Sequence, residues 1–131
     1  MKKKEYLIDT DILMDHLFTN DETSLLEKLM INGLCFTSAI NASELYFNSE
    51  HENIKLQIDK MLRALKVLGI HSRYSLDIFS FNNSTENFRD ALFSVVAKKN
   101  NLIICTTNKE RYSKTGIEVL DPNEIWGETW L

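Results

Sequence analysis

The chain has 131 residues, 44% hydrophobic and 26% charged, a composition that excludes wholesale disorder and predicts a single domain over residues 1–131. Its formal net charge of −4 argues against a protein that coats nucleic acid through a basic excess, although it is compatible with a nuclease whose pocket binds cations. No run approaches the roughly 18 apolar residues of a membrane span, and acids follow the basic residues 2–4 where a signal peptide would be apolar, so we expect a cytoplasmic protein without membrane contact.

Hydrophobic periodicity and turn residues predict strands that alternate with helices. In chain order, the predicted elements are a strand at 5–9, helices at 11–18 and 22–31, a strand at 34–37, helices at 39–47 and 52–68, a short strand and a short helix within 70–83, a helix at 85–100, and strands at 102–106 and 117–120. Strands separated by helices imply an α/β fold, with a parallel sheet and helices on both of its faces.

The cysteines and histidines indicate no metal site of their own. Cys35 and Cys105 each lie in an apolar, strand-like run, so we expect buried, reduced thiols. His16, His51 and His71 are scattered along the chain, without the paired spacing of zinc ligands.

An Asp at the end of the first predicted strand is the first candidate site residue. Asp9 follows the apolar run at 6–8, where a buried carboxylate has a substantial desolvation cost. The carboxyl edge of an open α/β sheet is also where ligands and ions bind. Asp9 or Asp11 could instead cap the following helix. A metal or phosphate role is favoured for Asp9, whereas both interpretations stay open for Asp11.

A helical acid is the second candidate. Within the predicted helix at 39–47, Glu44 lies four residues after Ile40 and three before Phe47, which places it in the apolar stripe. A carboxylate there needs a cation, a hydrogen-bond donor or a proton. The alternative is a side chain that reaches solvent at the edge of the helix.

Asp90 becomes a candidate site residue only when it is considered together with the other polar residues. Taken alone, it is a surface acid near a helix N-terminus, because it lies roughly opposite the predicted apolar stripe. That stripe comprises Phe88, Ala91, Leu92, Val95 and Val96.

Polar and basic residues follow the strand predicted at 102–106. Asn108 comes at the sheet edge that should also hold Asp9, and it offers an oxygen ligand or a donor without charge. Lys109, Arg111 and Lys114 form a small basic group that could bind RNA phosphates. An ordinary solvated loop explains these three residues equally well.

Four segments together resemble the motifs of PIN-domain ribonucleases, and most closely those of the VapC-type toxins of bacterial toxin–antitoxin pairs. They are Ile-Asp-Thr-Asp-Ile-Leu at 8–13, Thr-Ser-Ala-Ile followed by Ser-Glu-Leu within 37–45, Arg-Asp-Ala-Leu at 89–92, and Ile-Cys-Thr-Thr-Asn at 104–108. The resemblance implies a three-layer α/β/α sandwich with a mostly parallel central sheet. It also implies Mg²⁺- or Mn²⁺-dependent endoribonuclease activity on RNA and inhibition by a small antitoxin protein.

The resemblance also assigns the site by motif. The matching catalytic residues are Asp9, Glu44, Asp90 and Asn108, the first three of them as metal ligands, with Asp11 and Thr106 in support. The chain departs from the family at Asn108, where Asp is usual, and the missing charge should weaken a second metal site more than the first. The segment before the third motif, residues 70–89, is also shorter than usual.

Clustered carboxylates suit phosphodiester cleavage, because a hard cation bound by oxygen lowers the pKa of a bound water and neutralises phosphate charge. A PIN-like module that only binds RNA or protein is the alternative, which Asn108 leaves open. A haloacid-dehalogenase-like phosphatase could use Asp9 and Asp11, but Leu13 occupies the fifth position of that motif and no glycine follows.

Apolar helix faces predict a protein partner. The helix at 52–68, the segment 25–29 and the pair at 46–47 offer more apolar surface than a small sandwich needs to bury. We expect part of this surface to form a homodimer seam or a groove for an antitoxin helix, with packing inside the core as the alternative.

Overall fold

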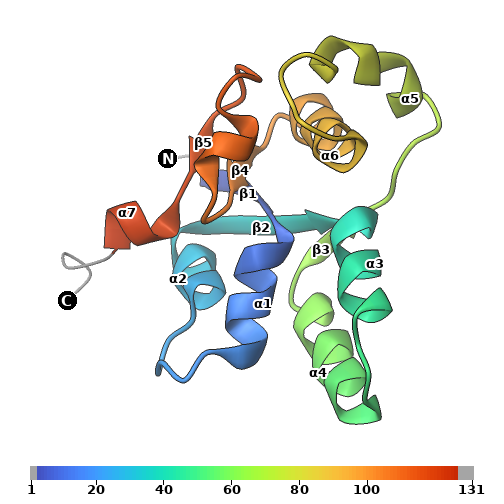
Figure 1. The fold of residues 1–131 in the computed structure, drawn as a ribbon. Helices are drawn as coiled ribbons and strands as arrows, with labels where there is room; N and C mark the ends of the chain where they lie inside the picture. Colours follow the sequence, from blue (N-terminus) through green and yellow to red (C-terminus); the bar gives the residue numbers. More distant parts are fainter. Residues whose placement is uncertain (1–2, 127–131) are drawn as a thin grey trace.

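A five-stranded sheet lies at the centre of the computed structural model, which describes residues 3–126 (Figure 1). The strands in spatial order are β3 (Lys66–Leu68), β2 (Gly33–Ser38), β1 (Lys4–Ile8), β4 (Ile103–Cys105) and β5 (Val119–Leu120). Every pairing in this sheet is parallel, which confirms the predicted α/β class.

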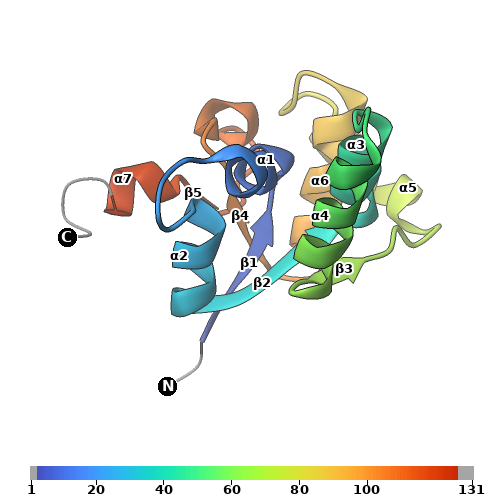
Figure 2. The same ribbon diagram turned by 90° about the horizontal axis from the view of Figure 1, so that it is seen from below.

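Helices cover both faces of the sheet, as the three-layer arrangement requires (Figures 1 and 2). One face is covered by α1 (Thr10–Phe18), α2 (Leu25–Asn32) and α4 (Glu52–Arg63). The opposite face is covered by α6 (Phe88–Lys99), beside α5 (Tyr74–Asp77) and the 3-10 helix η1 (Ile78–Phe81). The remaining elements are α3 (Ala39–Phe47), the 3-10 helix η2 (Lys109–Tyr112) and α7 (Pro122–Trp126).

The central strand supplies side chains to both hydrophobic cores. Tyr6 and Ile8 of β1 pack with the core beneath α1, α2 and α4, whereas Leu7 packs with the core beneath α6. In β4, Cys105 joins the first core and Ile104 the second. Successive strand residues point to opposite faces, and a parallel sheet covered on both sides therefore reads as an unbroken apolar run.

The strand order brings two candidate site segments together. The chain leaves β1 through α1 and α2 to reach β2, and it later returns through α6 to β4 on the other side of β1. Such a reversal opens a crevice at the carboxyl ends of the two strands. Asp9 follows β1 and Thr106 follows β4, and the Asp9 N–H donates to the Cys105 carbonyl at 2.9 Å.

The helix predicted at 52–68 is wrong in its last part. The helix α4 ends at Arg63, and Lys66–Leu68 form β3, which pairs in parallel with the end of β2. An apolar pattern over so few residues is compatible with both the helical and the strand period. These residues form a strand because they pair with the open edge of β2, which lies far away in the sequence. Within 70–83 the predicted short strand is also wrong, whereas the helix is confirmed as α5 and η1.

The helix α6 begins later than predicted and buries a broader face. Its cap is Asn87, which accepts a hydrogen bond from the Asp90 N–H at 2.8 Å, whereas the Thr85 hydroxyl donates to a backbone carbonyl of η1. Phe88, assigned to the apolar stripe from sequence, is 71% exposed, whereas Phe93 is fully buried. Asp90 is buried as well, because Asn87, Arg111 and Tyr112 contact its carboxylate.

Two further expectations concern the cysteines and membranes. Cys105 is buried and Cys35 half-buried, both are free thiols, and burial raises the pKa of Cys35 to about 12. Among residues 3–126, no helix has both the length and the apolar character needed to cross a membrane.

Candidate active site

Asp9 is positioned by the junction between β1 and α1, where it serves as the N-cap of that helix. Its side chain is fully buried, and its Oδ1 accepts from the Thr10 N–H at 2.8 Å and from Asn41 Nδ2 at 3.2 Å. The Tyr112 hydroxyl donates to Oδ2 at 2.6 Å, and Arg89 Nη2 donates to Oδ1 at 2.6 Å. Asp9 is therefore both a cap and a member of a charged cluster, and its donors compensate for the loss of water.

Glu44 reaches the same cluster from α3. Its Oε1 accepts from the Thr10 hydroxyl at 2.5 Å and from Arg89 Nη2 at 2.7 Å, and its Oε2 accepts from Arg89 Nε at 3.0 Å. Burial alone would raise the pKa of Glu44, but the hydrogen bonds from Arg89 and Thr10 hold that pKa below its usual range. Glu44 therefore points inward, and it is ionised at neutral pH.

Asp90 faces the cluster from the first turn of α6. Its Oδ1 accepts from Arg89 Nη1 at 3.1 Å, and its Oδ2 accepts from Arg111 Nε at 3.1 Å and from Asn87 Nδ2 at 3.2 Å. Arg111 Nη2 makes a further short contact with Oδ1. Burial would raise the pKa of Asp90, whereas Arg111 and Arg89 lower it. The carboxylates of Asp9, Glu44 and Asp90, which come from three different elements, thus surround one guanidinium.

Arg89 is the residue that this geometry adds to the sequence prediction. Its guanidinium binds all three carboxylates, and its side chain is only 20% exposed. Burial would lower the pKa of Arg89, but the hydrogen bonds to Glu44 and Asp9 raise it. The sequence held a partial signal, because clustered acids require positive charge from a metal or from the chain itself, and Arg89 is adjacent to the candidate acid Asp90.

Two uncharged residues of the cluster were also missed. The Tyr112 side chain is fully buried, and its hydroxyl bridges Asp9 and Arg89. Asn41 completes the capping box of Ser38 while its Nδ2 group donates to Asp9. The capping box could be predicted from its spacing, whereas the second contact joins residues 32 positions apart.

Asp11 lies outside the acid cluster and ties α1 to the loop after β4. Its Oδ2 accepts from the hydroxyls of Thr106 and Thr107, at 2.8 and 2.7 Å, and from the Thr107 N–H at 2.7 Å. The Asn108 N–H donates to the Thr106 hydroxyl at 3.1 Å. Within residues 3–126, no hydrogen bond joins the exposed Asn108 side chain to Asp9. The hydrogen bond between Asp11 and Thr106 therefore fixes α1 to the loop after β4 at this edge of the sheet.

The predicted basic group separates into three different environments. Arg111 enters the acid cluster, where it contacts Asp90 and lies 3.7 Å from Asp9. Lys109 instead forms an ion pair with Glu124 of α7 at 3.3 Å. Lys114 is exposed on the groove described next.

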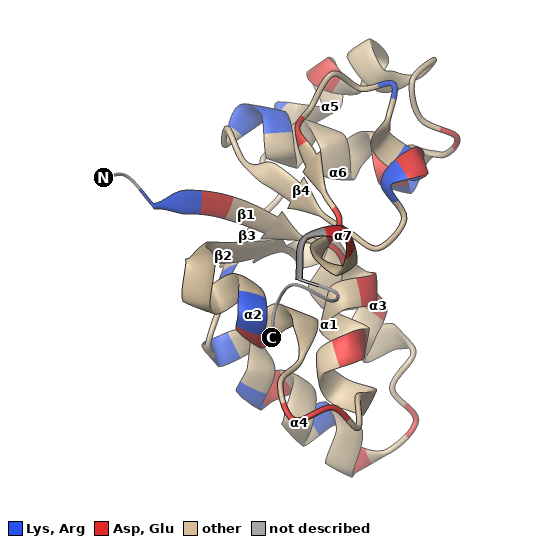
Figure 3. Ribbon diagram, turned by 90° about the vertical axis from the view of Figure 1, so that its left-hand side faces the viewer, with Lys and Arg blue, Asp and Glu red and all other residues tan. Residues whose placement is uncertain are grey.

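A polar groove of about 400 Å³ adjoins the cluster. Two segments line it, 83–86 before α6 and the turn around η2 that includes Asn108, Arg111 and Lys114. Arg111 belongs to both the groove and the cluster, so the two are continuous. In Figure 3, acidic and basic positions are interspersed along the ribbon of the described residues.

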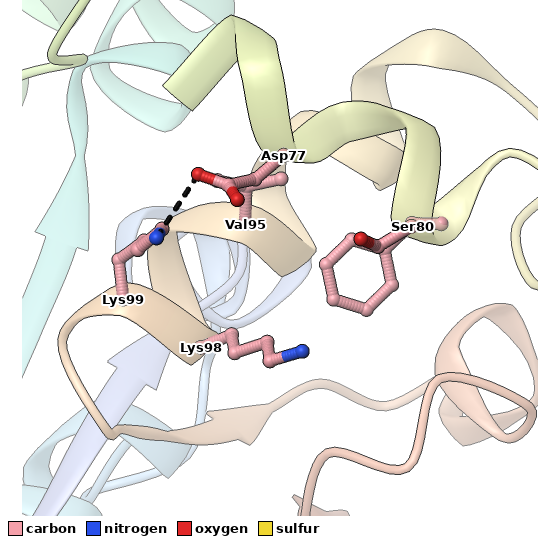
Figure 4. Close-up of a pocket in the computed structure, with 6 residues that line it drawn as sticks. Asp77, Ser80, Val95, Lys98 and Lys99 are labelled. Carbon is pink, nitrogen blue, oxygen red and sulfur yellow. Dashed lines mark ion pairs between the residues drawn. The ribbon is translucent and has the colours of Figure 1, made fainter. Parts of the chain in front are cut away.

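A second cavity lies away from the acids. It measures about 280 Å³ between η1 and α6, and Lys99 at its rim pairs with Asp77 at 3.0 Å (Figure 4). Phe81 and Val95 line it together with Lys98, whose ammonium lies 5.7 Å from the centre of the Phe81 ring. None of the acids that surround Arg89 lines this cavity.

The acid cluster contains the oxygen ligands that a divalent ion needs, but their arrangement in this structure does not form a metal site. Carboxylate oxygens are the ligands that Mg²⁺ and Mn²⁺ prefer, and Asp9, Glu44 and Asp90 supply them. Among the residues that the structure describes, however, no group of three or more His, Cys, Asp or Glu side chains is arranged to hold a metal. Arg89 lies where the carboxylates meet.

Comparison with known proteins gives one family and a consistent set of folds. The family model of the PIN domain matches residues 6–118, whereas no curated protein matches the chain by sequence. The fold is similar to that of DNA-bound VapBC from Salmonella typhimurium, at a TM-score of 0.77 and 16% identity over 93% of this chain and 99% of that one.

Two other solved structures share this fold. VapBC2 from Rickettsia felis, bound to a promoter DNA fragment, matches at a TM-score of 0.76 and 16% identity, over 88% of this chain and 97% of that one. Mycobacterium tuberculosis VapC20, a toxin that cleaves the sarcin–ricin loop, matches at 0.63 and 15% identity, over 86% and 95%. These structures confirm the predicted fold, and the family model confirms the resemblance to PIN domains.

Proposed function

This chain belongs to the PIN domain family, and from that premise we propose that it is a divalent-metal-dependent endoribonuclease and the toxin of a toxin–antitoxin pair. The observation that carries the proposal is the convergence of Asp9, Glu44 and Asp90 at the carboxyl edge of the sheet. This edge lies at the strand-order reversal beside β1, where α/β folds bind their ligands.

The three acids would hold Mg²⁺ or Mn²⁺ once the guanidinium of Arg89 has moved. Such an ion, when bound, would supply an activated water and would neutralise charge on the phosphate. Tyr112 and Asn41 hold the Asp9 carboxylate in a fixed orientation through one hydrogen bond each. Such fixed ligands lower the cost of assembling a charged site.

RNA is the proposed substrate, because VapC20, which shares this fold, is a toxin that cleaves the sarcin–ricin loop. The polar groove gives a nucleotide room beside the acids. Arg111 and Lys114 line it with positive charge that attracts phosphate, and Asn108 and Ser84 offer uncharged groups that can hydrogen-bond a base. Asn108 stands where the motif usually has a fourth carboxylate, and in this proposal it hydrogen-bonds the substrate.

A small antitoxin is the proposed partner. The Salmonella typhimurium and Rickettsia felis structures are both VapBC assemblies bound to DNA, and this chain has the toxin fold. Several of the predicted contact residues are exposed in the structure, Phe47 of α3 at 90% and Leu56 of α4 at 56%. A second copy of the chain is the other occupant that we propose for this surface.

A PIN-like module that binds RNA without cleaving it is the second candidate. The observation that favours it is that Arg89 and Arg111 already neutralise much of the charge that a metal would compensate. An enzyme and a binding module differ in turnover, so the deciding measurement is cleavage of RNA at a fixed ion concentration.

The test uses the full chain with a labelled structured RNA, in Mg²⁺, in Mn²⁺ and in EDTA. We expect cleavage with either ion, none in EDTA, and loss of at least about a hundredfold in rate for Asp9→Asn, because the substitution removes a charged ligand. Asp21→Asn is the matched control, since Asp21 is exposed on the turn before α2 and should leave the rate unchanged. RNA that is bound but never cut would establish the module instead.

A further inference from the structure

We propose that the guanidinium of Arg89 is the resident cation of the acid cluster and that a divalent ion binds there only by displacing it. The inference rests on the proposed function for the identity of the ion. The competition itself concerns side chains of this chain and can be measured without RNA.

The guanidinium takes the place where the carboxylates converge. Arg89 Nη2 lies 2.6 Å from Asp9 Oδ1 and 2.7 Å from Glu44 Oε1, and Nη1 lies 3.1 Å from Asp90 Oδ1. Its Nε adds a bond of 3.0 Å to the second oxygen of Glu44. An ion that used these oxygens would need the space that the guanidinium fills.

Charge leads to the same conclusion as space. The cluster holds the carboxylates of Asp9, Glu44 and Asp90 against the guanidiniums of Arg89 and Arg111. Because Asp9 and Asp90 are buried and the other three side chains are partly buried, each positive charge reduces the attraction for another cation. While Arg89 is in place, a divalent ion meets a formal charge of only about −1.

Arg89 can leave the cluster without unfolding it. It is the second residue of α6, its side chain is 20% exposed, and its neighbour Phe88 points into solvent with 71% of its surface exposed. Its guanidinium carbon lies 5.1 Å from the centre of the Phe93 ring, a contact that displacement must also break. The long, flexible stem of Arg89 lets the guanidinium rotate toward solvent once a competing cation binds the carboxylates. Arg111 remains as the partner of Asp90.

The first test measures Mn²⁺ binding by the full chain, from the electron paramagnetic resonance signal of free Mn²⁺. Arg89→Gln should bind Mn²⁺ at least about tenfold more tightly than the unmodified chain, because the competing charge is gone. Arg89→Lys should fall between the two, since an ammonium keeps the charge but cannot bridge three carboxylates. Arg73→Gln removes an exposed arginine before α5 and should change the affinity less than about twofold.

The second test follows the unmodified chain by NMR. The Arg89 Nε–H, bound to Glu44, should give a protected resonance without metal, assigned by its loss in Arg89→Lys. Added Mg²⁺ should move this resonance to the position of a solvated arginine. This measurement decides the question even if Arg89→Gln does not fold.

Two results would overturn the inference. One is Mn²⁺ affinity that is equal in the unmodified chain, Arg89→Lys and a folded Arg89→Gln. The other is an Nε–H resonance of Arg89 that stays unchanged while calorimetry shows Mg²⁺ bound. RNA cleavage reports separately on the proposed function: tighter binding by Arg89→Gln without cleavage by any variant would refute the nuclease and support the displacement.

Discussion

At the scale of single residues, the cluster depends on groups that satisfy the buried carboxylate of Asp9. Tyr112 donates to Asp9 Oδ2 at 2.6 Å, and Arg89 Nη1 donates to the Tyr112 hydroxyl at 2.8 Å. Burial, followed by the charge of Asp9, raises the pKa of Tyr112, so this phenol stays protonated and remains a donor. One hydroxyl therefore links an acid to the arginine that neutralises it.

Tyr112→Phe tests this link. Removing the hydroxyl leaves one buried oxygen of Asp9 without its shortest hydrogen bond, and we expect the free energy of unfolding to fall by about 1–3 kcal/mol. Urea denaturation followed by circular dichroism measures the change. Tyr74→Phe is the control, because its hydroxyl takes part in an exposed bond with Asn100. Equal stability of the two variants would mean that the Tyr112 hydroxyl contributes nothing net.

At the scale of elements, the approach of β2 to β1 depends on a small residue at the start of β2. Gly33 pairs with Lys4, and a methyl group added at Gly33 would overlap the Lys4 carbonyl and lie 2.9 Å from Cε2 of Tyr6. The sequence predicted only that a helix ends at residue 31 and that a strand begins at residue 34. The close packing of two backbones at this position depends on tertiary structure.

Gly33→Ala should destabilise the chain by about 1–3 kcal/mol, since the extra methyl group forces the first two strands apart. Gly69→Ala is a matched control, because its added methyl group meets nothing within 4 Å, and it should be neutral or slightly stabilising. Thermal unfolding of both variants compares them directly. A Gly33→Ala variant as stable as the Gly69→Ala variant would show that the strands yield at no cost.

At the scale of the whole molecule, the strand order brings the acids to one edge and leaves apolar groups on the outside. Ile58 and Met61 of α4 are buried in the core, which agrees with the core-packing alternative for this part of the helix. Phe47 and Leu56 remain exposed, on two helices that pack against each other. A homodimer through this surface stays a prediction.

The mass of the chain in solution tests that prediction. Light scattering coupled to size exclusion should give about twice the chain mass of 15.2 kDa. Phe47→Ser should shift the mass toward the monomer, because it removes an exposed aromatic anchor. Phe79→Ser changes an equally apolar group, 77% exposed on η1, and should leave the mass unchanged. A monomer at all concentrations would leave an antitoxin as the proposed occupant.

Features that depend on neighbouring residues could be predicted from local sequence patterns. Apolar runs separated by amphipathic helices specified a covered parallel sheet, and Asp9 stood at the end of its first strand because strand and cap signals are local. The spacing of Glu44 within α3 likewise indicated an inward side chain, and the hydrogen bond from Thr10 agrees with it. The roles of these acids as metal ligands stay predictions.

The groups that contact the acids come from distant parts of the chain, so they could not be predicted from local sequence patterns. Arg89 contacts Asp9 across 80 positions of sequence, and Tyr112 contacts it across 103. Periodicity reports which face of a helix is apolar, but it does not show which distant charge will lie against that face. The burial of Asp90 likewise depends on Arg111 and Tyr112, which lie 21 and 22 positions away in the sequence. Long-range packing, which no local pattern encodes, therefore decided the electrostatics of the site.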